Sequence, residues 1–126
     1  YNQFGERTLF LGTGSSGGGY LRTYNFDGQE TVYIGTGADS SGQMRIYDSS
    51  GETGTFIGSG YFRTYNQFGK MSTFLGNGRD GGGYLRTNNK FETETAFLGT
   101  NNSNEGLVNL NDKFGQSFWI RLNKGD

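Results

Sequence analysis

The sequence predicts an all-β fold built from one short repeat, and three observations lead to this prediction. A turn of the form Asn/Asp-x-x-Gly recurs along the 126 residues, two short apolar stretches follow each turn, and 24 glycines punctuate the chain without any proline. A fixed period of this kind is typical of stacked repeat architectures. Such a stack can be stable although only 31% of the residues are hydrophobic, because each layer buries its few apolar side chains against the next.

The turn sets the period of the repeat. Its last position is spaced 23, 23, 18, 23 and 23 residues apart, at Gly5, Gly28, Gly51, Gly69, Glu92 and Gly115. We therefore predict a single repetitive domain over residues 1–126. Its copies are 1–23, 24–46, 47–64, 65–87 and 88–110, followed by a C-terminal partial repeat or cap at 111–126. Because the chain begins in mid-repeat without Met, we expect a processed product or part of a longer protein.

The first apolar stretch of each copy carries an aromatic residue followed by an aliphatic one, as in Phe10-Leu11-Gly12. Side chains alternate along a strand, so the two kinds of residue point to opposite faces. A strand that is apolar on both faces is normally covered on both. We favour an inter-chain or core contact over a carbohydrate-binding stripe for this aromatic ladder, which comprises Phe10, Tyr33, Phe56, Phe74, Phe97 and Trp119.

The second apolar stretch places arginines between tyrosines. The arginines are Arg22, Arg45, Arg63 and Arg86, and the tyrosines are Tyr20, Tyr24, Tyr47, Tyr61, Tyr65 and Tyr84. One interpretation is a surface ladder for an anionic or sugar ligand, with rings as platforms and guanidinium groups as donors. We favour the other, in which each arginine leans on a ring or on a carboxylate such as Glu30 or Glu52, because unpaired like charges in a row would repel.

Composition argues against several classes of function. There is no Cys and no His, so disulfides, thiolate metal sites and the commonest general base are missing, and we expect no enzyme, no cofactor and no metal. The turn aspartates Asp39, Asp48, Asp80 and Asp112 do not have calcium-loop spacing, and we interpret them as solvated. A net charge of -1 without blocks of one sign argues against nucleic acid, and no apolar run is long enough for membrane insertion.

The arrangement of the strands allows three architectures. A single chain that closed each coil by itself would give a stub of about 26 Å, which is short for a solenoid. Three chains around one axis would make a slender fibre from sparse apolar ladders, so we predict an intertwined triple-stranded β-helix. A single-chain solenoid and an antiparallel hairpin array are the alternatives, because the four-residue turn could also join consecutive strands directly.

The repeat also resembles a known group of proteins. The pattern G-x-Leu-x-x-Tyr-Asn-x-x-Gly-x-x-x-x-Phe-Leu-Gly, which covers nearly the whole chain, is similar to the repeats of trimeric β-helical shafts in phage tail fibres and of repeat-rich bacterial surface proteins. The resemblance implies a rigid extracellular, cell-surface or virion fibre that assembles with itself as a homotrimer or filament. The alternative is an adhesin or lectin that recognises cell-surface glycans through its Tyr/Arg face.

Overall fold

The computed structural model describes residues 1–122, and all the regular secondary structure in that range is β-strand. No helix long and apolar enough to cross a membrane occurs among these residues. Contacts between Cα atoms divide the chain into two compact units, Tyr1–Ser59 and Gly60–Asp126. The boundary falls at the Ser59-Gly60 step, where the short third copy lacks the longer loop of its neighbours.

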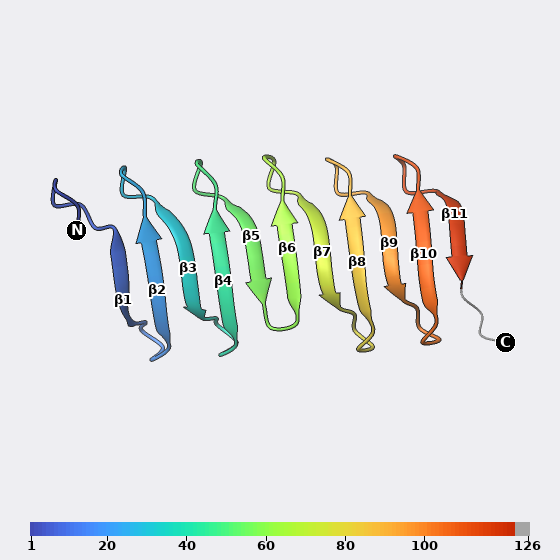
Figure 1. The fold of residues 1–126 in the computed structure, drawn as a ribbon, viewed down its shortest axis with the longest axis horizontal. Helices are drawn as coiled ribbons and strands as arrows, with labels where there is room; N and C mark the ends of the chain where they lie inside the picture. Colours follow the sequence, from blue (N-terminus) through green and yellow to red (C-terminus); the bar gives the residue numbers. More distant parts are fainter. Residues whose placement is uncertain (123–126) are drawn as a thin grey trace. The chain divides into compact units, whose positions relative to one another are not determined.

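The first unit is an open antiparallel sheet whose strands lie side by side in sequence order (Figure 1). Its strands are β1 (Leu9–Thr13), β2 (Gly19–Tyr24), β3 (Glu30–Thr36), β4 (Gly42–Tyr47) and β5 (Thr53–Gly58). The second unit repeats this plan with β6 (Tyr61–Tyr65), β7 (Met71–Asn77), β8 (Gly83–Asn88), β9 (Glu94–Thr100), β10 (Gly106–Asn111) and β11 (Ser117–Leu122). Copies one, two, four and five therefore each supply one hairpin within a unit, as their two apolar stretches suggest.

Strand pairing selects among the three architectures. Within each unit every strand pairs antiparallel with its neighbours in sequence, for example Phe10 opposite Arg22 and Arg22 opposite Tyr33. This is the pairing of the antiparallel hairpin array, which was one of the two alternatives to the predicted triple-stranded β-helix. The all-β repeat is thus confirmed, whereas the solenoid and the triple-stranded β-helix are not confirmed. The reason is the tight turn, which reverses the chain between adjacent strands instead of carrying it to a new layer.

The turns share one geometry. In the turn of residues 25–29, the amide of Gly28 donates to the carbonyl oxygen of Asn25 at 3.1 Å, and the Asn25 side chain accepts the amides of Asp27 and Gln29. This is a three-residue hairpin loop whose last residue is left-handed. The predicted turn glycines Gly5, Gly28, Gly51, Gly69 and Gly115 all have positive φ, and Glu92 adopts the same conformation at 70°. The opposite ends of the strands use equivalent turns at residues 14–18, 37–41, 78–82 and 101–105.

A β-bulge follows the Asn/Asp-type turns. Tyr24 pairs with Glu30 and Thr23 pairs with Val32, so Thr31 is left over in the ladder. Its hydroxyl oxygen lies 2.7 Å from that of Thr23. Equivalent hydroxyl pairs join Thr64 to Ser72 at 2.8 Å and Thr87 to Thr95 at 3.1 Å. These three bulges therefore each have a hydrogen bond of their own, which fixes the register beside the turn.

Each unit is a single layer. Phe74 is the one apolar side chain among the described residues that is buried, at 6% exposure. Cross-strand rows of apolar residues, all aliphatic except Phe62, cover one face, which we call the aliphatic face. In the first unit the row is Leu11, Leu21, Ile34, Met44 and Ile57, and in the second it is Phe62, Leu75, Leu85, Leu98 and Val108. Leu11 is 77% exposed and Leu75 and Leu98 are each 54% exposed, so no part of the same unit covers this face.

Candidate functional site

The aromatic ladder and the arginines occupy the same face of the sheet. Phe74 lies opposite Arg63 on β6 and opposite Arg86 on β8. Residues opposite each other in antiparallel strands point to the same side. The sequence suggested two separate surfaces, an apolar one and an amphipathic one. The structure combines them into one surface, which we call the ladder face, on the side opposite the aliphatic face.

Aromatic rings stack in rows across the strands of the ladder face. In the first unit, Tyr20 lies between Phe10 and Tyr33, with ring centroids 5.3 and 5.8 Å apart. In the second unit the row is longer. Its centroid distances are 5.8 Å for Tyr61–Phe74, 4.7 Å for Phe74–Tyr84 and 5.2 Å for Tyr84–Phe97. The rings stack on one another and so cover much of one another's apolar surface without a second layer.

The arginines lean on these rings, as we favoured from the sequence. The Cζ atom of Arg22 lies 4.7 Å from the ring centroid of Tyr20, and that of Arg63 lies 4.5 Å from the centroid of Tyr61. Arg45 and Arg86 lie over Phe56 and Phe74 at 5.5 and 5.9 Å. The Nε atoms of all four are buried and make no hydrogen bond, which fits cation–π contact rather than a solvated ladder.

One carboxylate joins this arrangement. Glu30 forms an ion pair with Arg22 at 3.2 Å. Burial lowers the pKa of Arg22, but the charge of Glu30 and the Tyr24 hydroxyl outweigh it, so the pKa is raised. Burial and the nearby Glu30 also raise the pKa of Tyr47. Glu52, the other expected partner, lies instead in the turn that begins at Asp48.

Trp119 does not belong to the aromatic ladder. It lies opposite Leu110, and Ile120 lies opposite Asn109, so Trp119 takes the aliphatic face. In the other copies the ladder residue lies five positions after the last residue of the turn. Counted in the same way from Gly115, the ladder position is Ile120 and not Trp119. The Trp119-Ile120 pair has the same aromatic-aliphatic order as the pairs of the other copies, but it begins one position closer to the turn.

The ladder face has a polar hollow in the first unit. The second copy carries Gln43 where other copies have Tyr20, Tyr61 or Tyr84, so the row of rings is interrupted there. A hollow of about 170 Å³ lies at this place, and its lining includes Gln43, both neighbouring arginines and Glu30. We call it the Gln43 hollow.

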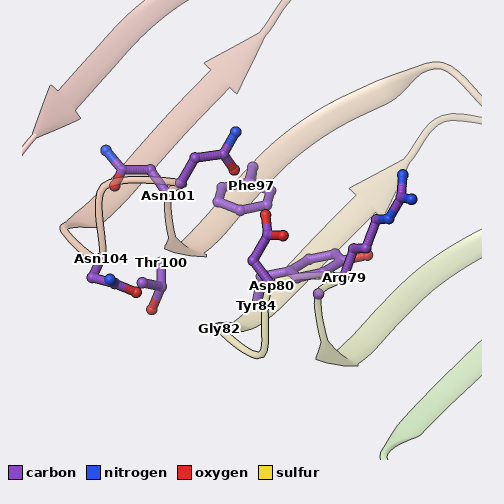
Figure 2. A pocket seen from close by; sticks show the side chains of 10 residues that line it. Arg79, Asp80, Gly82, Tyr84, Phe97, Thr100, Asn101 and Asn104 are labelled. Carbon is purple, nitrogen blue, oxygen red and sulfur yellow. The ribbon is translucent and has the colours of Figure 1, made fainter.

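A second cavity lies where strands β7 to β10 meet their loops, and Figure 2 shows it from close by. This loop pocket has a volume of about 240 Å³. The rings of Tyr84 and Phe97 line it from the ladder face, and two loops add polar groups. These polar side chains include Arg79, Asp80, Asn102 and Asn104. Figure 2 shows the carboxylate of Asp80 pointing toward the Phe97 ring.

Exposed phenylalanines in the turns were missed from the sequence. Phe91 and Phe114 are each 72% exposed, and Lys90 and Lys113 lie over their rings at 5.0 and 4.9 Å. These four residues help to line a groove of about 610 Å³. Phe4, Phe26 and Phe68 occupy other turns of the same type. A large apolar residue in a solvent-exposed turn was the available signal, because such turns favour small polar residues.

Three of the four turn aspartates accept hydrogen bonds within their own turns. Asp48 accepts the hydroxyl and amide of Ser50, and Asp39 accepts those of Ser41. Asp112 accepts the amides of Phe114 and Gln116. No group of three or more acidic side chains that could hold a metal ion occurs in the described part of the chain.

Comparison with known proteins adds no family. No protein-family model matches the chain, and no curated protein matches its sequence.

Proposed function

We propose that the chain is a structural segment that assembles with further copies of itself through the aliphatic face. The observation that carries the proposal is the exposure of this face, on which Leu11, Leu75 and Leu98 each have more than half of their surface in contact with solvent. A sheet with one apolar face normally buries it against another layer. Contiguous exposed apolar surface of this kind marks an interaction site.

Another copy of the chain is the simplest partner. The aliphatic rows recur at the strand spacing, so two such faces have the same period and can interdigitate. We propose three copies, with three sheets facing inward around one axis, in a rigid extracellular, cell-surface or virion fibre. The resemblance to fibre-shaft repeats supports the number three and the location. The role is mechanical, and it includes no catalysis, cofactor or metal.

The oligomeric mass tests this proposal. We expect light scattering on the purified chain to give a trimer, or filaments that negative-stain images resolve into three-chain layers. Leu75→Lys with Leu98→Lys should yield monomers, because two ammonium groups would have to be buried at the interface. Ser103→Lys, in an exposed turn, adds a charge away from the face and should leave the mass unchanged. A monomeric wild type at micromolar concentration would refute the proposal.

A second candidate function rests on the Gln43 hollow. Arg22 and Arg45 contribute two positive charges there and Glu30 one negative charge, so the hollow favours an anionic ligand such as an acidic sugar. This is the adhesin or lectin alternative, narrowed to one place on the Tyr/Arg face. Arg22→Ser with Arg45→Ser should abolish binding of sialylated or uronic-acid oligosaccharides. Arg63→Ser with Arg86→Ser is the matched control and should retain it, and equal losses in both variants would refute a local site.

A further inference from the structure

We propose that the loop pocket binds one sugar residue of a neutral glycan. This inference does not depend on the assembly proposed above, and the site is separate from the Gln43 hollow. The volume of about 240 Å³ is below the range of pockets for drug-sized ligands, about 300–1,000 Å³, and suits a single residue of a longer chain.

The pocket has an apolar wall that is held in place by the repeat. Tyr84 lies across Gly99, where an added Cβ atom would clash with the Cβ of Tyr84. Glycine therefore lets the tyrosine lie against the backbone of β9 and stack on Phe97 at 5.2 Å. Rings fixed in this way give the pocket an apolar wall that carries one phenol hydroxyl. That surface suits a sugar ring, which has apolar C–H patches beside its hydroxyls.

A backbone acceptor distinguishes this pocket from its counterpart in the first unit. There, Tyr33 donates its hydroxyl to the carbonyl oxygen of Thr36 at 2.9 Å. Phe97 replaces that tyrosine and has no hydroxyl, so the carbonyl oxygen of Thr100 receives no such bond. Because Thr100 lines the pocket, this oxygen can accept a hydrogen bond from a ligand hydroxyl.

Two loops supply the remaining polar groups. The side chains of Arg79, Asp80, Asn102 and Asn104 make no hydrogen bond or ion pair within residues 1–122. Together they offer planar donors and acceptors, which is the pattern that fixes the orientation of a polyhydroxylated ligand. The charges of Arg79 and Asp80 cancel. The pocket therefore favours an uncharged ligand, in contrast to the Gln43 hollow.

The equivalent loops of the first unit lack these groups. Copies one and four share the segments YNQFG, FLG and GGGYLRT, but Ser15-Ser16 in the first copy corresponds to Arg79-Asp80 in the fourth. Ala38 and Ser40 correspond in the same way to Asn102 and Asn104, with φ of 65° for Ser40 and 62° for Asn104. Variants that carry the first-unit residues are therefore compatible with the turn geometry.

The test is a titration of the isotope-labelled full chain, followed by amide chemical shifts. The probes are tetrasaccharides of glucose, galactose, mannose and N-acetylglucosamine. We expect at least one to shift amides in residues 78–84 and 97–104 saturably. Arg79→Ser with Asp80→Ser should weaken binding by about tenfold or more, and Asn102→Ala with Asn104→Ser should do the same. Ser15→Ala with Ser16→Ala, in the equivalent loop, should not change the affinity.

Several outcomes would overturn the proposal. These are the absence of binding by all four tetrasaccharides, saturable shifts only outside the two loops, or undiminished binding in both pocket variants. Tighter binding of an uncharged Ser/Asn-rich hexapeptide than of any sugar would also overturn it in favour of a peptide site. Because every variant is also weighed by light scattering, failure of glycan binding and failure of self-assembly are read independently.

Discussion

At the scale of single residues, the first residue of each Asn/Asp turn carries much of the local order. Asp48 accepts the Ser50 hydroxyl at 2.6 Å and the amides of Ser50 and Glu52 at 2.9 and 3.1 Å. These bonds, the Ser50 hydroxyl first, hold the pKa of Asp48 below its ordinary value. A carboxylate whose pKa is lower in the folded state than in the unfolded state stabilises the fold at pH values above its unfolded-state pKa. That stabilisation is lost as the pH falls through the folded value.

Asp48→Asn should remove this acid sensitivity. Asparagine fills the same position in the turns that begin at Asn25, Asn66 and Asn89, where its oxygen accepts the same two amides. We expect similar thermal midpoints for wild type and variant at pH 7, and a smaller loss for the variant below about pH 4. Thermal unfolding at pH 7 and at acid pH measures the difference. An equal loss in both proteins would mean that other carboxylates account for the acid response.

Glu92 is the one residue other than glycine in the last slot of these turns. Its φ of 70° is costly for a side chain with a Cβ atom, by about 1 kcal/mol. The carboxylate of Glu92 offsets part of this cost through an exposed ion pair with Lys70 at 3.8 Å. Glu92→Gly should raise the free energy of unfolding by up to about 1 kcal/mol, as denaturant unfolding would measure. Glu92→Ala keeps the backbone strain but loses the ion pair, so it should lower the free energy of unfolding. Stabilisation by alanine would contradict this account.

At the scale of the strands, stacked rings provide the stability that a second layer would normally provide. Phe74 has a ring neighbour on each side, Tyr61 and Tyr84, whereas Phe97 at the end of the row has Tyr84 alone. Phe74→Ala should therefore lower the free energy of unfolding by about 3 kcal/mol, and Phe97→Ala by clearly less. Chemical denaturation of both variants tests the ranking. Equal losses would show that ladder position does not matter.

Much of this element-scale structure was predictable from the sequence. The turn glycines, the paired strands of each copy and the contact of arginines with rings all followed from local pattern, because turn chemistry and alternation act over a few residues. The direction of strand pairing did not follow, since the same turn is compatible with a stack or a hairpin. The face of Trp119 was misjudged because the pattern was matched by residue type and not counted from Gly115.

The candidate sites were less predictable than the strands. The loop pocket combines residues 79–80 with residues 102–104, which belong to different copies and meet only when β8 and β9 pair. The Gln43 hollow depends on one missing ring in a row that runs across strands. Both are properties of the neighbours that the register brings together, and the register was open at the level of sequence.

At the scale of the whole molecule, the two faces predict opposite responses of self-assembly to salt. The aliphatic row in the second unit, of which Leu75, Leu85 and Leu98 are members, contains no charge from β6 to β10 and ends beside Arg121 on β11, whereas the ladder face carries several arginines and Glu30. Association through apolar surface is strengthened by sulfate and is little affected by screening. Association through charged groups weakens as ionic strength rises.

We therefore expect the assembled fraction to stay constant between low salt and about 0.5 M NaCl, where the Debye length falls from tens of ångströms to only a few, and to rise in sodium sulfate. Sedimentation velocity over this series measures the fraction directly. The Leu75→Lys and Leu98→Lys double variant should remain monomeric throughout, which controls for general salting-out. Dissociation on addition of NaCl would place the contact on the ladder face instead. The arginines would then leave their rings and pair with carboxylates of a neighbouring copy. The aliphatic face would in that case need another partner.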